Sequence, residues 1–113
     1  MSVFTVGYEG RSFAGFVALL REHSIDVVVD VRRYPRSKVP EYGRESLGRS
    51  LPLVGLSYVF LGDLLGGFRP GGYPNYMASD AYQSGIQRLL ELAREQNVVL
   101  MCKERDELRC HRK

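Results

Sequence analysis

Residues 25–31, IDVVVDV, form an almost uninterrupted apolar run. A strand with one face in water alternates apolar and polar residues, whereas a strand covered on both faces is apolar along its whole length. This segment therefore predicts an interior strand of a sheet that carries helices on both faces. Sheets of that kind are mainly parallel, because each crossover between parallel strands needs a helix.

Three further short apolar segments predict strands, and they lie at residues 3–8 (VFTVGY), 56–61 (LSYVFL) and 98–102 (VVLMC). Together with residues 25–31 they give four strands, separated by segments long enough to hold a helix. The sequence thus predicts an α/β fold with a mainly parallel four-stranded sheet flanked by helices. In such folds ligands bind beyond the carboxyl ends of the strands.

Helical periodicity fills the intervals between these strands. Ser12 and Ser79 are good N-caps, and each precedes apolar residues spaced three and four positions apart. Residues 44–54 predict a weaker helix that is interrupted by Gly48 and ended by Pro52. The elements therefore alternate from strand to helix along the chain.

The chain has 113 residues, which predicts a single domain over residues 1–113. No apolar run is long enough to span a bilayer, and the first residues lack the features of a signal peptide. A cytoplasmic location without membrane contact is therefore expected, with both cysteines as thiols. The sequence predicts no oligomeric state.

Charge is concentrated in one stretch between Arg32 and Arg49, although the formal net charge of the chain is only +3. Six basic residues lie there against Glu41 and Glu45; they are Arg32, Arg33, Arg36, Lys38, Arg44 and Arg49. Such a stretch can attract phosphate groups or nucleic acid, and it can equally be a solvated surface.

Chemically active residues follow the first two strands. Tyr8, Glu9 and Arg11 surround a glycine turn, and the helix N-terminus behind it offers free amides to an anion. Asp30 ends the buried second strand, and Arg32 points to the same face two residues later. This pair either anchors the loop as an ion pair or grips a ligand with Arg32 while Asp30 orients it.

A glycine-rich segment follows the third strand over residues 62–78 and includes Tyr76. Loops without secondary structure are rarely this long unless they bind or cover a ligand. Its aromatic residues could stack on a base or close over a substrate, or they could simply pin the loop to the domain.

Both cysteines lie at the end of the chain, in MCKERDELRCHRK. Cys102 fits either a nucleophile with a lowered pKa or a small buried hydrophobic residue. A zinc site would have only Cys102, Cys110 and His111, two of them adjacent, so we predict no zinc site. In an enzyme, Glu9 or Glu104 could serve either as a base or as a ligand for a divalent metal. A redox pair of the two cysteines, in a scaffold protein, is a third alternative. Glu104 and Arg112 complete the charged groups that we single out in this stretch.

Five segments taken together resemble the domain-of-unknown-function family 488: GYEGRS (7–12), DVRRYPRS (30–37), LGDLLGG (61–67), YPNYM (73–77) and LMCKE…CHR (100–112). The resemblance covers almost the whole chain and implies an α/β domain without an assured activity. Members of the family usually continue into a further helix after the Cys-His-Arg segment, so the resemblance implies that this chain lacks a C-terminal helix. No cofactor is implied.

The first hypothesis is an enzyme that acts on a phosphorylated substrate, such as a nucleotide or nucleic acid. Its catalytic candidates are Glu9, Asp30, Cys102, Glu104 and His111, and its substrate-binding candidates are Tyr8, Arg11, Arg32, Tyr76 and Arg112. The alternatives are a nucleic-acid-binding module without catalysis and a redox-sensitive scaffold or interaction domain.

Overall fold

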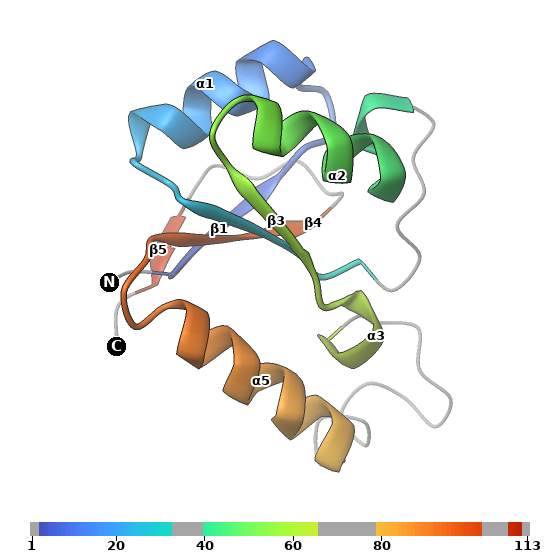
Figure 1. The fold of residues 1–113 in the computed structure, drawn as a ribbon, viewed down its shortest axis with the longest axis vertical. Coiled ribbons are helices and arrows are strands. Elements are labelled where there is room, and N and C mark those ends of the chain that lie inside the picture. The colour runs from blue at the N-terminus through green and yellow to red at the C-terminus, as the bar shows by residue number, and fades with distance from the viewer. Residues whose placement is uncertain (1–2, 33–39, 66–78, 103–108, 112–113) are drawn as a thin grey trace.

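The computed structural model describes residues 3–32, 40–65, 79–102 and 109–111, and for Leu64 and residues 109–111 it describes the backbone alone. These residues form a central five-stranded sheet in the order β3-β2-β4-β1-β5 (Figure 1). The strands are β1 (Val3–Gly7), β2 (Val27–Asp30), β3 (Ser57–Phe60), β4 (Val98–Cys102) and β5 (Arg109–His111).

The predicted α/β fold is confirmed, because β1 to β4 are the four expected strands and all pair in parallel. The fifth strand was not predicted. β5 pairs antiparallel to β1 at the edge of the sheet, in a stretch that the sequence analysis took for a loop. Three residues are too few to give a recognisable alternation of side chains.

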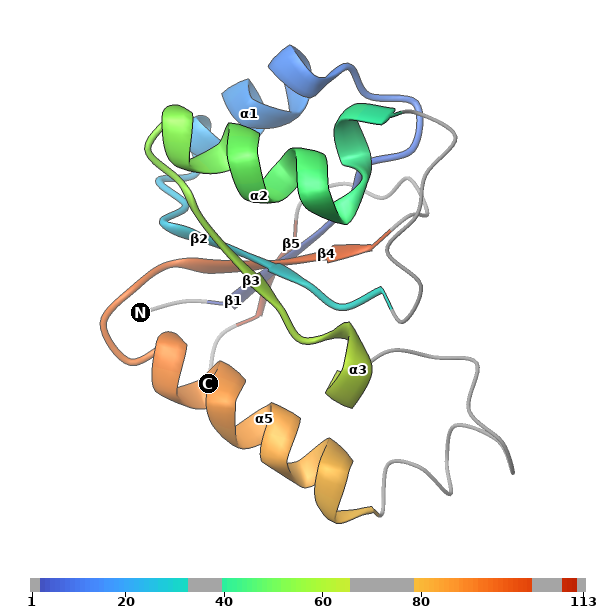
Figure 2. The same cartoon turned by 45° about the vertical axis from the view of Figure 1, so that its right-hand side comes forward.

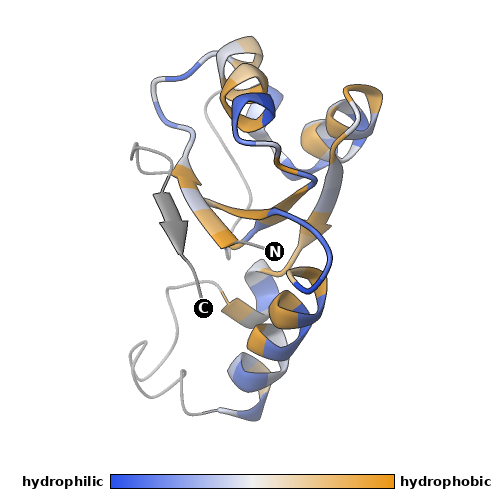
Figure 3. Ribbon diagram, turned by 90° about the vertical axis from the view of Figure 1, so that its left-hand side faces the viewer, coloured by the Kyte–Doolittle hydropathy of each residue, from blue (hydrophilic) through white to orange (hydrophobic). Residues whose placement is uncertain are grey.

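Helices cover both faces of the sheet in the described part of the chain (Figures 1 and 2). α1 (Phe13–Glu22) and α2 (Arg44–Leu53) lie on one side, and α3 (Gly62–Leu65) and α5 (Asp80–Leu92) lie on the opposite side. A short 3-10 helix, η1 (Pro40–Tyr42), precedes α2. The strands between these layers are predominantly apolar (Figure 3).

The core is divided by the sheet into two clusters. Val6, Val28, Val99 and Met101 pack beneath α1 and α2, whereas Val27, Val29 and Val98 pack with Leu89 of α5. Alternate residues of β2 and β4 therefore point to opposite layers, as the continuous apolar run of residues 25–31 predicts. Within the described residues, no helix is long and apolar enough to cross a membrane.

The predicted helix caps are confirmed in the structure. The Ser12 hydroxyl accepts a hydrogen bond from the Gly15 amide at 3.1 Å, and the Ser79 hydroxyl accepts one from the Tyr82 amide at 3.2 Å. The prediction for residues 44–54 needs correction, since α2 runs through Gly48 and includes Pro52 in its last turn. Proline is tolerated there because only one intrahelical bond is lost before the helix ends.

Gly62 begins α3 directly against the backbone of Arg32. A Cβ atom at this position would lie only 1.8 Å from the Arg32 carbonyl oxygen. Only glycine allows β3 to turn into α3 at this distance from the end of β2. The close approach therefore fixes how the ends of β2 and β3 sit against each other.

We expect Gly62→Ala to lower the free energy of unfolding by about 1–3 kcal/mol or more, because backbone atoms must shift to admit the methyl group. Gly48→Ala is the matched control: its Cβ would meet Tyr58 at 3.9 Å, an ordinary contact, and alanine favours a helix by about 0.5–1 kcal/mol. Urea unfolding of both variants measures the difference. Equal stabilities would contradict the close approach.

Candidate functional site

The candidate site lies where β1, β2 and β3 end, on the face of the sheet that α1 and α2 cover. Tyr8 directly follows β1, Asp30 closes β2, and Arg32 follows two residues later. The helices that follow β2 and β3 lie on opposite faces of the sheet, since β2 leads to α2 and β3 leads to α3 (Figure 2). In α/β sheets, such a divergence marks the usual place for a ligand.

Asp30 holds Arg32 in one orientation. The Asp30 side chain is fully buried, and its Oδ1 accepts hydrogen bonds from the Arg32 amide at 3.0 Å and from Arg32 Nε at 2.9 Å. Its Oδ2 accepts from Arg32 Nη2 at 2.7 Å and from the Tyr58 hydroxyl at 2.6 Å. Each carboxylate oxygen thus accepts two hydrogen bonds. The predicted pairing of Asp30 with Arg32 is present.

The electrostatics of this cluster favour a charged Arg32 and a neutral Tyr58. Burial alone lowers the pKa of Arg32, but the hydrogen bonds and charge of Asp30 outweigh it, with a smaller contribution from Tyr8, so that the pKa lies above its ordinary value. Burial, followed by the hydrogen bond to Asp30, raises the pKa of Tyr58. Arg32 therefore stays charged and Tyr58 stays a donor at neutral pH.

Tyr8 packs between Arg32 and Tyr42. The Arg32 guanidinium lies over the Tyr8 ring, 5.2 Å from its centroid. Tyr42 stacks on Tyr8 with ring centroids 4.4 Å apart, and its own hydroxyl donates to the Arg11 carbonyl oxygen at 2.9 Å. The Tyr8 ring is thereby fixed from both sides.

Two polar atoms of this cluster have no hydrogen-bond partner within the described part of the chain. They are the Tyr8 hydroxyl and Arg32 Nη1, and both are buried. Tyr8 is 3% exposed and Arg32 is 9% exposed. A buried donor without a hydrogen-bond partner costs about 1–3 kcal/mol of folding free energy. The side chains of Tyr8 and Arg32 are neighbours, so two such donors in one cluster need an explanation.

Two further arginines lie near this cluster. Arg11 donates from Nε to the Gly7 carbonyl oxygen at 2.9 Å, and Arg44 lies over the Phe60 ring, 4.1 Å from its centroid. Their charges act against the raised pKa values of Tyr42 and Tyr58, respectively. Gly10, with a φ of 76°, makes the turn that brings Arg11 back toward β1.

Glu9 and Cys102 lie at the same edge of the sheet but do not join the cluster. Glu9 is exposed. Cys102 ends β4 and alternates with Met101, so it points to the α5 face, opposite to Arg32. Its thiol donates to the Val6 carbonyl oxygen at 3.6 Å and is half-buried.

The backbone of His111 does not lie at this edge, although the sequence analysis selected this residue as a catalytic candidate together with residues that do. Its backbone pairs with Val3 at the start of β1, roughly 16 Å along the strand from Tyr8. The reason is the unpredicted β5, which carries the chain back along β1. Tyr76, Glu104 and Arg112 lie outside the described residues.

Strand order also decides against an intramolecular redox pair. Cys102 is opposite Gly7 on one side of β1, and Cys110 is opposite Phe4 on its other side. Two strand spacings and three residues of offset separate their Cα atoms by roughly 14 Å. A disulfide needs Cα atoms within about 7 Å, so the fold does not permit this bond without backbone movement.

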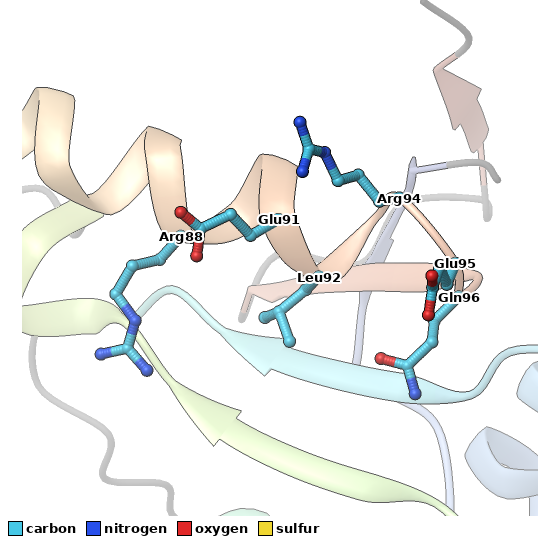
Figure 4. Close-up of a pocket in the computed structure, with 6 residues that line it drawn as sticks. All are labelled: Arg88, Glu91, Leu92, Arg94, Glu95 and Gln96. Carbon is cyan, nitrogen blue, oxygen red and sulfur yellow. The ribbon is translucent and has the colours of Figure 1, made fainter.

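A surface hollow lies at the opposite edge of the sheet, at the end of α5 and the turn before β4 (Figure 4). Its lining mixes charges of both signs with one leucine: Arg88, Glu91, Leu92, Arg94, Glu95 and Gln96. None of the residues that the sequence analysis selected lies there. The hollow is therefore separate from the cluster around Arg32.

Sequence reasoning missed Tyr42 and Tyr58, which complete the cluster. A signal for Tyr58 was present, because Leu56, Tyr58 and Phe60 alternate along the predicted strand 56–61 and so share a face. The sequence does not reveal the parallel register, which sets Tyr58 opposite Val28 and so brings its hydroxyl to Asp30. No pattern marked Tyr42, which reaches Tyr8 from the 3-10 helix η1 before α2.

Comparison with known proteins gives a family and no function. Neither a curated protein nor a solved structure matches the sequence. Residues 12–113 match the family described as Domain of unknown function DUF488, which is nearly the whole chain. The chain belongs to this family, as its segments around Asp30 and Cys102 suggested.

Proposed function

We propose that the chain binds a phosphate-bearing ligand at the ends of β1 and β2, with one phosphate oxygen accepting from Arg32 Nη1 and the Tyr8 hydroxyl. The observation that carries this proposal is the pair of buried donors without a partner among the described residues. Asp30 occupies the Nε and Nη2 side of the guanidinium and leaves Nη1 for another acceptor. Arginine held in this way is well suited to phosphate oxygens.

Binding is better supported than turnover. Within the described chain, Asp30 is the one proposed catalytic residue that contacts Arg32. Each of its carboxylate oxygens already accepts two hydrogen bonds. Asp30 therefore positions the guanidinium and is poorly placed to take a proton from a substrate. Nucleic acid is one possible source of the phosphate group. Of the described arginines in the basic stretch, Arg32 is buried against Asp30, whereas Arg44 and Arg49 are exposed and can meet further phosphates.

Both donor atoms are buried, so a ligand reaches them only after a local opening of the chain that covers them. Such an opening is compatible with binding if the ligand gains more in the bound state than the opening costs. Inside, an oxygen between Nη1 and the Tyr8 hydroxyl would satisfy both donors at once.

Tyr8→Phe tests the proposal, because it removes one hydroxyl and keeps the ring between Arg32 and Tyr42. We expect the unliganded variant to be as stable as the wild type or slightly more stable, since a buried unsatisfied group is lost. Its phosphate affinity is expected to fall by about tenfold or more, the value of one hydrogen bond to a charged group. Thermal unfolding with and without inorganic phosphate measures both effects.

Tyr82→Phe is the matched control, because it makes the same change on α5 at the other face of the sheet. It should leave the phosphate-induced shift unchanged. If Tyr8→Phe instead loses stability and keeps the full phosphate shift, its hydroxyl has a structural partner and the proposed site is wrong.

A further inference from the structure

Among the described residues, the buried side chains of the candidate site carry no net charge, which limits the ligand that they can hold. The Asp30 carboxylate binds Arg32 through two hydrogen bonds to its side chain, including a salt bridge of 2.7 Å. Tyr42 and Tyr58 stay neutral, since burial raises the pKa values of both. One guanidinium and one carboxylate therefore cancel within this buried cluster.

Among the described residues, the other charged groups near this cluster lie at its margin, where they are half-buried or exposed. Arg11 is half-buried and already bound to the Gly7 carbonyl, whereas Arg44 is exposed above Phe60. Glu41 is exposed as well and opposes Arg11 in its effect on Tyr42. Exposed charges are screened by water and salt, so they compensate a buried anion only weakly.

Two buried donors are available within the described part of the chain, Arg32 Nη1 and the Tyr8 hydroxyl. Arg32 Nη1 and the Tyr8 hydroxyl can saturate one anionic oxygen between them. A second charged oxygen on the same group would find neither a donor nor a positive charge among these buried atoms. A buried charge without a partner is strongly disfavoured.

We infer that the group bound at Arg32 and Tyr8 carries a single negative charge, as a phosphodiester does, and is not a doubly charged terminal phosphate. The inference rests on the proposed function, whose ligand class it narrows. A phosphodiester has one charge shared by two oxygens and its other two oxygens are esterified. One of its anionic oxygens can meet both donors while the rest of the group faces away from Asp30.

The test is an NMR titration of ¹⁵N-labelled protein with dimethyl phosphate and with methyl phosphate. Dimethyl phosphate keeps one charge at every relevant pH, whereas a phosphate monoester gains its second charge near a pKa of about 6. At about pH 8 we expect dimethyl phosphate to bind several-fold to about tenfold more tightly. At about pH 5, where both ligands carry one charge, the difference should nearly vanish.

Dimethyl phosphate also reports any titration of the protein itself, because its own charge is constant. The titratable and charged groups facing the site are Tyr8, Arg11, Asp30, Arg32, Glu41, Tyr42, Arg44 and Tyr58. Titration of these groups changes the affinity for both esters, so the ratio of the two affinities cancels that shared change. Methyl phosphate binding more tightly at about pH 8 than dimethyl phosphate would overturn the inference and leave the proposed site standing.

If neither ester binds in a manner that Tyr8→Phe weakens, the proposed function and the inference fall together. If dimethyl phosphate does bind at this site, a short single-stranded oligonucleotide separates two sources of a diester. Tighter binding than dimethyl phosphate, with a steep loss at higher salt, identifies a nucleic-acid backbone. Affinity equal to that of dimethyl phosphate identifies a small diester.

Discussion

Asp30→Asn is expected to lower the free energy of unfolding by about 3–5 kcal/mol, because it leaves the buried Arg32 guanidinium without a counterion. The side chain keeps its size, so little packing is lost. Asp30 is fully buried and accepts four hydrogen bonds, three from Arg32 and one from Tyr58. An amide can accept at one of its two positions only, and its NH₂ group would face a donor.

Asp26→Asn is the control for this change. Asp26 precedes β2, is exposed, and accepts one hydrogen bond from the Asn97 amide at 2.8 Å. An asparagine can still accept that bond, so we expect a change within about 0.5 kcal/mol. Urea unfolding of both variants at neutral pH compares them. A loss at Asp30 no greater than that at Asp26 would mean that Arg32 is not held as described.

A double replacement separates the charge from the packing. Asp30→Leu combined with Arg32→Met removes both charges together, and buried ion pairs replaced in this way often lose little stability. We expect the double variant to be more stable than Asp30→Asn. It should bind no phosphate, since the guanidinium is gone.

Tyr42→Ala is expected to cost about 3–5 kcal/mol, the usual loss for a large aromatic side chain in a core. Tyr42 is fully buried and stacks on Tyr8. Its ring also meets Phe13 and Phe16 edge-on, at centroid distances of 6.3 and 5.5 Å. Removal of the ring therefore opens a cavity under α1 and frees Tyr8 on one side.

Tyr42→Phe keeps the ring and tests the hydroxyl alone. Its loss removes the hydrogen bond to Arg11, worth about 0.5–1.5 kcal/mol, so the cost should be far below that of alanine. Thermal or urea unfolding of both variants measures the contrast. Similar losses for alanine and phenylalanine would show that the stacked ring contributes little.

The pH dependence of unfolding at alkaline pH gives a second test of Tyr42→Phe. Burial and, after it, the charge of Glu41 raise the pKa of Tyr42 to about 12 from its ordinary value of 10.0. Because the unfolded chain then loses this proton first, the stability that Tyr42 contributes is complete below about pH 10 and is lost as pH rises toward 12. Tyr42→Phe should make this alkaline loss of stability less steep. Part of the loss should persist in the variant, because the pKa of Tyr58 is raised as well.

Local sequence signals predicted the layers of the fold well. The apolar run of residues 25–31 indicated a strand covered on both faces, and the caps at Ser12 and Ser79 placed two helix starts. These features depend on neighbours within one turn or a few residues. Their physical causes, side-chain alternation and capping of free amides, are therefore present in the sequence itself.

Partners that are distant in sequence could be predicted only in part. Asp30 and Arg32 were paired correctly because two residues along a strand return to the same face. Tyr58 joins them through the register between β2 and β3, and Tyr42 reaches Tyr8 from η1. Neither long-range pairing has a local signature, although alternation along β3 marked the face on which Tyr58 lies. His111 was misplaced for the same reason, since a short antiparallel strand at the sheet edge is decided by long-range pairing.

The central claim is that Arg32 Nη1 and the Tyr8 hydroxyl meet a phosphate oxygen. The most direct measurement is an NMR titration of protein labelled with ¹⁵N in arginine side chains, observing the Arg32 guanidinium while dimethyl phosphate is added. We predict a saturable change at Arg32 in the wild type that is much weaker in Tyr8→Phe. An Arg32 signal that stays unchanged while other arginines respond would contradict the account.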